Sequence, residues 1–313
     1  MHIRRCATGI EILAPAKVNL FFEVLNRRDD GYHEVETLMV PISLYDTLWF
    51  ESAPPGKVSL VARWGAGLLR HTAKVQTGEP PSALMFGNLP QGEENLAVRA
   101  VRLLAQRAGT DWGAKMHLVK RIPAAAGLGG GSSDAAAALL AANWIWKLNW
   151  PTDILADVAA EIGSDVSFFL KSKPAICRGR GERIETISGL AAVHLVMVRP
   201  PAGLATALVY RHCQIVTPPR QVEPVVNALG HNKLSDLGPI AHNRLLGAAR
   251  TLSPWIDRTL KVLRGENCPA IGMSGSGSCC FAVCRTAQHA RYVAARLRCR
   301  QPGIGWIQAV CTV

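Results

Sequence analysis

The segment from Pro123 to Asp134 combines residue types that suit a phosphate group. It reads Pro-Ala-Ala-Ala-Gly-Leu-Gly-Gly-Gly-Ser-Ser-Asp and precedes a run rich in alanine. Glycine lets the backbone adopt positive φ and approach a ligand closely, and the free N–H groups at a helix start attract anions. The segment lacks the Gly-Lys-Ser/Thr ending of a P-loop and the usual glycine spacing of a dinucleotide site. It therefore predicts a phosphate site of another type, with a flexible turn as the alternative.

Two other segments carry side chains suited to phosphoryl transfer to an alcohol. Strand alternation places Lys17 and Asn19 on one face of an extended run. A lysine beside an amide suits recognition of a hydroxyl group and of developing charge, and a solvated lysine is the alternative. Asp165 precedes the apolar residues Phe168 and Phe169, and a carboxylate that enters a core strand requires a partner. A capping or ion-paired aspartate is the alternative there.

Tyr32 and His33 follow a turn that ends at Gly31. Taken alone, they are most simply a surface aromatic residue and a structural histidine. An aromatic ring also suits a flat base, because every base has a π-face.

The nine cysteines are scattered along the chain, and no C-x-x-C pair occurs. Cys280 and Cys284 lie four residues apart, with His289 further along. A zinc site requires tighter ligand spacing and a second pair. We therefore predict buried free thiols in a reducing cytoplasm and no metal held by protein ligands.

Composition limits the class of protein. Of 313 residues, 49% are hydrophobic and 19% are charged, which is typical of a globular chain with a core. The formal net charge of +12 is compatible with nucleic acid or with anionic small molecules. The basic residues at 291, 296, 298 and 300 are interleaved with apolar ones at helical spacing, which favours a solvated helix face. We expect a cytoplasmic protein, monomer or weak homodimer, without a secretory signal, membrane span or nucleic-acid partner.

Periodicity and turn residues predict strands and helices in both halves of the chain. Strands are predicted at 10–25, 34–42, 47–51, 58–62, 116–119, 168–170, 175–177, 193–199, 270–273, 279–284 and 306–311. Helices are predicted at 95–107, 133–146, 152–162, 222–228, 243–249, 254–264 and 287–298, with Thr152 as a cap. Residues 65–91 predict a long loop or insertion. The pattern favours the α+β class, with domains at 1–190 and 191–313.

At this point the sequence resembles a known family. Pro123 to Ala137 is similar to the phosphate loop of the GHMP kinases, which include galactokinase, homoserine kinase and mevalonate kinase. Further motifs follow in the order expected for that family: Pro15–Leu20, Asp30–Glu34, Glu94–Leu96, Gly163–Val166, Gly179–Glu182 and Met273–Ser278. The resemblance covers nearly the whole chain. It implies the GHMP kinase fold, with two α+β domains and the active site in the cleft between them.

The resemblance also implies an ATP-dependent kinase that uses Mg²⁺ and phosphorylates a cytidine-diphosphate-linked alcohol of non-mevalonate isoprenoid synthesis. Asp165 would be the catalytic base and Lys17 its oriented partner. The residues expected to bind ATP are Pro123, Ala124, Ala125, Ala126, Gly127, Leu128, Gly129, Gly130, Gly131, Ser132, Ser133, Asn95 and Lys120. The residues expected to bind the cytidine substrate are Asn19, Tyr32, His33, Thr206 and Tyr210, with Tyr32 and Tyr210 on the two faces of the base.

Two alternatives stay open. A kinase of the homoserine or mevalonate type would keep the fold but would not need the Tyr32–His33 pair. A non-catalytic nucleotide-binding protein on the same scaffold would not need both Lys17 and Asp165. The chain departs from the family at Ser167, where proline is frequent, and after Asn243, where an acidic residue is usual.

Overall fold

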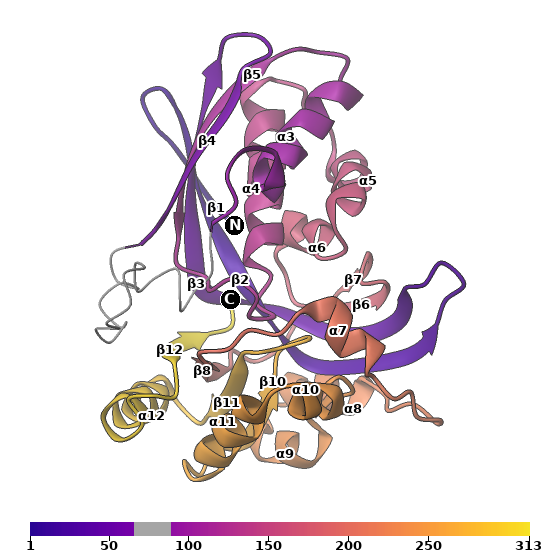
Figure 1. The fold of residues 1–313 in the computed structure, drawn as a ribbon, viewed down its shortest axis with the longest axis vertical. Helices are drawn as coiled ribbons and strands as arrows, with labels where there is room; N and C mark the ends of the chain where they lie inside the picture. Colours follow the sequence, from indigo (N-terminus) through magenta and orange to yellow (C-terminus); the bar gives the residue numbers. More distant parts are fainter. Residues whose placement is uncertain (66–88) are drawn as a thin grey trace. The chain divides into compact units, whose positions relative to one another are not determined.

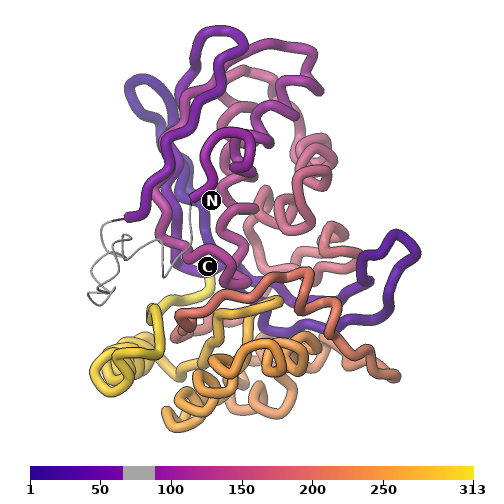
Figure 2. Tube along the Cα trace, viewed as in Figure 1, coloured from indigo at the N-terminus to yellow at the C-terminus, as the bar shows by residue number. Residues whose placement is uncertain are grey.

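The computed structural model describes residues 1–65 and 89–313 (Figures 1 and 2). The chain forms two compact units, each assembled from separate stretches of sequence. The first unit comprises residues 1–16, 44–124 and 129–172, and the second comprises residues 17–43, 125–128 and 173–313. The loop predicted at 65–91 falls largely outside the described residues. The domain boundary predicted after residue 190 stays a prediction.

Two long strands contribute to both units. They are β2 (Gly9–Arg27) and β3 (His33–Ala53). All side chains of residues 14–24 in β2 and of residues 37–42 in β3 are buried, as expected where both faces of a sheet are covered. The strands predicted at 10–25, 34–42 and 47–51 are therefore confirmed, with the latter two joined into one strand.

The sheet of the first unit contains strands in the order β1–β2–β3–β5–β4. The additional strands are β1 (His2–Arg5), β4 (Val58–Trp64) and β5 (Gly113–Lys120). The beginning of β2 runs antiparallel to β1, with His2 opposite Leu13. The end of β3 runs antiparallel to β5, with Thr47 opposite Val119, and β4 runs parallel to β5.

Helices cover this sheet in the first unit (Figure 1). They are η1 (Gly92–Glu94), α3 (Leu96–Arg107), α4 (Gly130–Ile145), α5 (Thr152–Ile162) and α6 (Val166–Lys171). Helix α3 begins where the Asn95 side chain accepts a hydrogen bond from the Ala97 N–H at 2.9 Å, and it packs along α4. An amide at this position satisfies one of the N–H groups that lack a partner at a helix start. The helices predicted at 95–107 and 152–162 are confirmed, although Pro151 rather than Thr152 occupies the cap position.

The strand predicted at 168–170 was wrong, because these residues belong to the short helix α6. Its buried residues include Val166, Phe168 and Phe169, and the helix packs against α4 and α5. A short apolar run between turn residues has no clear period, so a buried strand and a buried helical turn look alike in sequence. Asp165 therefore precedes a helix and not a core strand.

The start of α4 also differs from the prediction. The helix begins at Gly130, three residues before the predicted Ser133, and Gly129 occupies the cap position with φ of 70°. Ser133 and Asp134 consequently lie inside the first turns and are buried. The glycines at 127 and 129 both have positive φ, so the loop turns twice in the left-handed region before the helix starts.

The second unit contains the other ends of β2 and β3 and a separate four-stranded sheet. Strand β6 (Ala175–Gly179) runs antiparallel to β3, with Val35 opposite Gly179, β7 (Arg183–Thr186) pairs with β6, and β9 (His242–Asn243) pairs with β2. The separate sheet is antiparallel throughout. It has the order β10 (Ala270–Met273), β11 (Cys280–Cys284), β8 (His194–Arg199) and β12 (Trp306–Cys311).

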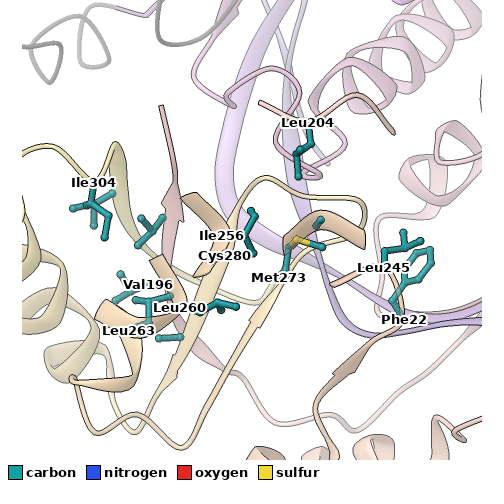
Figure 3. Packing of buried hydrophobic residues seen from close by; sticks show 14 of the residues in the cluster. Phe22, Val196, Leu204, Leu245, Ile256, Leu260, Leu263, Met273, Cys280 and Ile304 are labelled. Atoms are coloured by element: carbon teal, nitrogen blue, oxygen red, sulfur yellow. The ribbon is translucent and has the colours of Figure 1, made fainter. Parts of the chain in front are cut away.

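Helices pack on this antiparallel sheet and form the core of the second unit. They include α7 (Thr206–Arg211), α8 (Glu223–Gly230), η2 (Leu234–Asp236), α9 (Leu237–Ile240), α10 (Leu246–Leu252), α11 (Pro254–Arg264) and α12 (Ala287–Arg300). Ile256, Leu260 and Leu263 of α11 recur at helical spacing and meet Val196 and Met273 in one apolar cluster (Figure 3). Each such side chain contributes about 1.5–3 kcal/mol when fully buried. Strands and helices mixed in both units confirm the α+β class.

Helix α12 carries the basic residues near the C-terminus, as their helical spacing predicted. Thr286 caps its start by accepting a hydrogen bond from the His289 N–H at 3.0 Å. Val293, Ala294 and Leu297 are buried, whereas Arg291, Arg298 and Arg300 are exposed. Within the part of the chain that the structure describes, no helix is both long and apolar enough to cross a membrane.

Candidate active site

The predicted phosphate loop packs against a second glycine-rich turn, which we call the C-terminal glycine loop (Ser274–Ser278). The Ser274 hydroxyl donates a hydrogen bond to the Gly127 carbonyl at 2.8 Å. A Cβ at position 127 would lie 2.1 Å from the Ser274 carbonyl oxygen, and φ there is +72°. The Cys279 N–H donates to the Ala126 carbonyl at 3.1 Å. Residue 127 must therefore be glycine, because both its conformation and its neighbour exclude a side chain.

Lys17 and Asn19 lie together beneath these turns, as predicted from strand alternation. The Lys17 ammonium donates a hydrogen bond to Asn19 Oδ1 at 2.6 Å, and the two residues are only 4% and 2% exposed. The backbone N–H of Lys17 donates to the Leu128 carbonyl at 3.0 Å. The alternative of a solvated lysine is therefore wrong. A buried ammonium must be held by polar partners, so this lysine is fixed in place.

Asn19 connects the lysine to the C-terminal glycine loop. Its amide donates a hydrogen bond to the Thr37 hydroxyl at 2.8 Å, and its backbone N–H donates to the Ser274 hydroxyl at 3.2 Å. A Cβ at Gly275 would lie 3.1 Å from Asn19 Oδ1 and 3.4 Å from Lys17 Nζ. The C-terminal glycine loop consequently lies directly against the Lys17–Asn19 pair, and a side chain at position 275 would require these two groups to shift and would be strained by the φ of +54° there.

An aromatic pair lies further along the second unit. The rings of His33 and Tyr210 have centroids 5.1 Å apart and planes inclined by 35°. Tyr32 is 54% exposed, and the Arg180 guanidinium lies 4.9 Å from the centroid of its ring. Burial and the positive charge of Arg27 lower the pKa of His33 below its ordinary value. His33 is therefore neutral near pH 7, with a donor and an acceptor nitrogen.

The aromatic pair and the lysine are connected through α7. Thr206 and Tyr210 lie one turn apart on this helix, and the Thr206 hydroxyl lies 2.9 Å from the Ser276 hydroxyl. The C-terminal glycine loop thus contacts α7 at Ser276 and the Lys17–Asn19 pair at Ser274 and Gly275. Four of the five residues predicted for the alcohol substrate therefore lie in one connected part of the second unit, and they are Asn19, His33, Thr206 and Tyr210.

In the first unit, Lys120 lies between two buried carboxylates. Its ammonium contacts Asp46 Oδ2 and donates to Asp134 Oδ2 at 2.5 Å. Asp46 also accepts hydrogen bonds from the backbone N–H groups of Arg121 and, at 2.9 Å, Ile122. The side chains of Asp46, Lys120 and Asp134 are 0%, 7% and 4% exposed. We call these three residues the buried ionic triad.

The buried ionic triad lies beneath the start of α4. Asp134 belongs to this helix, and a Cβ at Gly130 would lie 3.1 Å from Lys120 Nζ. Burial lowers the pKa of Lys120, but the charges of Asp134 and Asp46 raise it by more, so the lysine stays charged. Burial raises the pKa of Asp134 well above its ordinary value. The positive charge of Lys120 lowers this pKa in part, and the nearby Asp46 raises it further. The triad therefore fixes the helix start, and the adenine contact predicted for Lys120 stays a prediction.

The remaining predicted residues lie in the first unit. The Asn95 amide donates to the Pro90 carbonyl at 2.9 Å while its oxygen caps α3. Asp165 occupies the cap position of α6, whereas Lys17 belongs to the second unit, and their pairing stays a prediction. Ser167 donates a hydrogen bond to the Ala156 carbonyl at 3.1 Å, so the serine in the usual place of proline has a structural partner.

Sequence reasoning missed Glu23, Thr37 and Asp46. Glu23 and Asp46 are fully buried, and each stands within an apolar strand segment. A lone acid in such a segment requires a partner, and the same argument that singled out Asp165 could have found both. Their partners lie far away in sequence, so the sequence alone does not name them.

Comparison with known proteins gives the class of this site. Residues 95–173 match the family described as GHMP kinases N terminal domain, and residues 225–302 match GHMP kinases C terminal. The first match contains the phosphate loop and the second contains the C-terminal glycine loop. The chain therefore belongs to the GHMP kinase family, and it is a kinase.

Particular relatives narrow the group. The chain is 38% identical to a 4-diphosphocytidyl-2-C-methyl-D-erythritol kinase of Pelotomaculum thermopropionicum, covering 92% of this chain and 94% of the relative. It is 37% identical to the enzyme of the same name from Rhodopirellula baltica, over 95% and 93% of the two chains. A crystal structure of 4-(cytidine 5'-diphospho)-2C-methyl-D-erythritol kinase matches with a TM-score of 0.76 and 36% identity, over 97% and 99% of the chains.

A more distant structure shares the fold alone. Homoserine kinase from Cytophaga hutchinsonii matches with a TM-score of 0.74 at 17% identity, over 100% of this chain and 97% of the other. The resemblance inferred from the motifs is confirmed at the level of the family and of the 4-diphosphocytidyl-2-C-methyl-D-erythritol kinases within it.

Proposed function

We propose that this chain transfers the γ-phosphoryl group of ATP to the 2-hydroxyl of 4-diphosphocytidyl-2-C-methyl-D-erythritol. The names of the relatives at 37–38% identity support the substrate. The observation within this chain that carries the proposal is the pairing of His33 with Tyr210, next to an exposed Tyr32. Kinases that act on small aliphatic alcohols have no base to hold, so they have no need of such rings.

The cytosine ring would bind at these aromatic side chains. Tyr32 offers an exposed face for stacking, and Tyr210 offers a second ring. His33, which is neutral near pH 7 because of its lowered pKa, can donate one hydrogen bond and accept another. This combination suits the edge of cytosine, which carries both an amino donor and acceptor atoms.

The triphosphate of ATP would bind at the glycine-rich loop and the start of α4. The loop glycines leave backbone N–H groups accessible, and the helix dipole favours anions at this end. The buried ionic triad keeps the helix start fixed beneath the loop. Phosphoryl transfer needs positioning and electrostatic stabilisation more than covalent chemistry, which is what a rigid loop provides.

Magnesium would bind through oxygen atoms in the same region. Mg²⁺ prefers oxygen ligands and is held by few protein groups together with the substrate phosphates. The Ser133 hydroxyl, in the second turn of α4, is buried and has no hydrogen-bond partner among the described residues. This hydroxyl oxygen is a suitable ligand for Mg²⁺ and would hold the ion. The bound ion would supply positive charge that neutralises the phosphate oxygens.

Asp165 would accept the proton of the attacking hydroxyl, and Lys17 would stabilise the charge that develops there. The tight bond between Lys17 and Asn19 keeps the ammonium oriented without neutralising it, because an amide carries no charge. The C-terminal glycine loop would close on the substrate phosphates, since its backbone lies against the same lysine.

A coupled assay of ADP release tests the proposed substrate. The purified chain would be given ATP and Mg²⁺ with the cytidine-diphosphate alcohol, homoserine or mevalonate in separate reactions. We expect kcat/KM for the cytidine substrate to exceed the other two by at least about 10³-fold, because a site built for a polar base rejects substrates without it. Comparable rates with homoserine or mevalonate would reject the proposal.

A further inference from the structure

A group of metal-ligating side chains lies in the second unit, apart from the residues of the candidate active site. The ligand atoms of Cys268, Cys284 and His289 all lie within 4.8 Å of one another. Cys284 is buried, whereas Cys268 and His289 are partly exposed. The group therefore has a buried side and an open side through which an ion can enter.

Three different elements bring these side chains together. Strand β10 pairs with β11, with Ala270 opposite Val283, so the chain just before β10 runs beside the end of β11. Cys268 precedes β10 by two residues, and Cys284 is the last residue of β11. His289 lies in the first turn of α12, which follows β11 after a short connection. Strands β10 and β11 are neighbours in the sheet, and α12 packs against β11.

The spacing along the sequence had placed Cys280, and not Cys268, together with Cys284 as a candidate pair of metal ligands. Cys280 and Cys284 lie on one strand, and residues four apart on a strand are about 13 Å distant, too far to share an ion. The strand pairing instead supplies Cys268 from the neighbouring strand end. This is why ligand spacing along the sequence argued against a metal.

The distance between the sulfur atoms fits a shared ion. The Sγ atoms of Cys268 and Cys284 are 3.9 Å apart. Two sulfur ligands of a tetrahedral zinc ion, each about 2.3 Å from the metal, are separated by about 3.8 Å. A disulfide requires a separation of about 2.0 Å. An ion can therefore bind with little movement of either sulfur, whereas a disulfide requires a large shift.

We propose that Cys268, Cys284 and His289 form a binding site for a thiophilic divalent cation, Zn²⁺ being the best fit, with water as the fourth ligand. Two thiolates and one neutral imidazole balance the charge of the ion, and binding releases the two thiol protons to solvent. Sulfur and imidazole ligands select zinc over magnesium. The site is thus chemically distinct from the magnesium site of phosphoryl transfer, and it does not depend on the proposed function.

Existing contacts of the three side chains leave room for the ion. His289 Nδ1 accepts a hydrogen bond from the Arg285 N–H at 3.3 Å, which is long for such a bond. Cys268 also lies 3.7 Å from the Glu266 carbonyl oxygen. These are weak interactions, and metal–ligand bonds would replace them. The bound ion would join the start of β10, the end of β11 and the start of α12, and so stabilise the second unit.

Cobalt binding to the whole chain tests the site directly. Co²⁺ substitutes for Zn²⁺ and gives an intense absorption band when thiolates bind it. The reduced protein, freed of metal with a chelator, should bind one equivalent of Co²⁺ with this band, and Zn²⁺ should abolish the band by displacement. Cys268→Ser, at a partly exposed position, should lose the band. Cys299→Ser, an exposed cysteine on α12, should keep it.

Thermal unfolding gives a second measurement that is independent of the cobalt spectrum. An ion that binds only the folded state raises the melting temperature as its concentration rises above Kd. We expect Zn²⁺ to raise the melting temperature of the wild type and of Cys299→Ser, but not that of Cys268→Ser. His289→Gln should weaken cobalt binding without removing the thiolate band. Absence of the band in the wild type, or its persistence in both Cys268→Ser and Cys284→Ser, would overturn the proposal.

Discussion

The guanidinium of Arg244 donates two hydrogen bonds to the carboxylate of Glu23, from Nε to Oε1 at 2.6 Å and from a terminal nitrogen to Oε2 at 2.8 Å. The Glu23 side chain is fully buried, and its carboxylate also accepts the N–H groups of Val24 and Arg220, each at 2.9 Å. Bidentate pairs of this kind are the strongest of protein hydrogen bonds. Arg244 occupies a position where related chains usually have an acidic residue. In this chain it is paired with the buried carboxylate of Glu23 on β2.

This ion pair holds the segment that supports the C-terminal glycine loop. Asn243, next to Arg244, donates hydrogen bonds to the carbonyl groups of Met273 at 2.7 Å and Gly275 at 2.8 Å. Gly275 in turn lies against Lys17 and Asn19. A change at Glu23 should consequently affect both the stability of the fold and the geometry around Lys17.

Glu23→Gln should destabilise the protein by about 3–5 kcal/mol at pH 7, because it leaves the largely buried guanidinium of Arg244 without its charged partner. Urea unfolding followed by circular dichroism measures this. Asp257→Asn is a matched control, since Asp257 forms an exposed ion pair with Arg250 at 2.6 Å, and it should cost less than about 1 kcal/mol. Equal losses in the two variants would contradict the role given to Glu23.

The same variant carries a pH test. Burial raises the pKa of Glu23, but the bonds from Arg244 and from the Arg220 and Val24 N–H groups lower it by more, so the folded pKa lies below the ordinary value. Between the folded and the unfolded pKa of Glu23, the unfolded chain therefore binds more protons than the folded chain. The stabilisation that the Glu23 carboxylate gives to the fold is complete above about pH 4.3 and is lost as the pH falls further. The stability difference between wild type and Glu23→Gln should shrink below pH 4. A difference that stays constant would contradict the lowered pKa.

Lys120→Met should destabilise the first unit and weaken ATP binding. It leaves Asp46 and Asp134 buried without their cation, at a cost of about 3–5 kcal/mol, and it releases the start of α4. If Lys120 acts by positioning this helix start, the loss of affinity should be larger for ATP than for adenosine in calorimetric titration. Equal losses for both ligands would instead place Lys120 at the adenine, as the family resemblance implies.

Lys115→Met is the control for that experiment. Lys115 lies on the same strand β5, is 54% exposed at its side chain and lies 3.6 Å from Glu51. Its replacement should change stability by less than about 1 kcal/mol and leave nucleotide binding unchanged.

Asp165→Asn should lower kcat by about 10²–10⁴-fold, the usual contribution of a general base, while ATP binding stays within a few-fold of wild type. Steady-state kinetics and nucleotide titration on the same preparation measure the two effects. Asp153→Asn, an exposed acid in the first turn of α5, should leave both unchanged. Turnover near wild type in Asp165→Asn would reject the assignment of the base.

Tyr32→Ala should weaken binding of the cytidine substrate and leave ATP binding unchanged. Loss of one stacked base costs about 1–3 kcal/mol, which corresponds to an increase of about 5- to 150-fold in KM. The control is Tyr292→Ala, at an exposed tyrosine on α12. Equal weakening of both substrates by Tyr32→Ala would move this residue out of the alcohol site.

Local patterns in the sequence predicted much of this structure. Helix α3 follows from apolar residues at helical spacing, and the shared face of Lys17 and Asn19 follows from strand alternation. Both depend on residues within one turn or one strand. The short helix α6 did not follow, since six residues with adjacent phenylalanines fit a buried strand equally well.

Interactions between distant segments could not be predicted in this way. Glu23 and Arg244 are 221 positions apart, and Asp46 and Lys120 are 74 apart. An acidic residue within an apolar strand indicates that a partner exists. Which residue is the partner depends on strand pairing and packing. The same holds for Cys268, which the pairing of β10 with β11 brings to Cys284. The residues of the family motifs could be named from the sequence, while the contacts that hold them could not.

Phosphorus NMR of the reaction product tests the central claim most directly. In 4-diphosphocytidyl-2-C-methyl-D-erythritol the carbon that bears the 2-hydroxyl carries no hydrogen, so a phosphate attached there has no proton three bonds away. We predict that incubation with ATP and Mg²⁺ yields one new phosphomonoester signal that stays a singlet without proton decoupling. A doublet or triplet would place the phosphate on another hydroxyl, and no new signal would contradict the proposed activity.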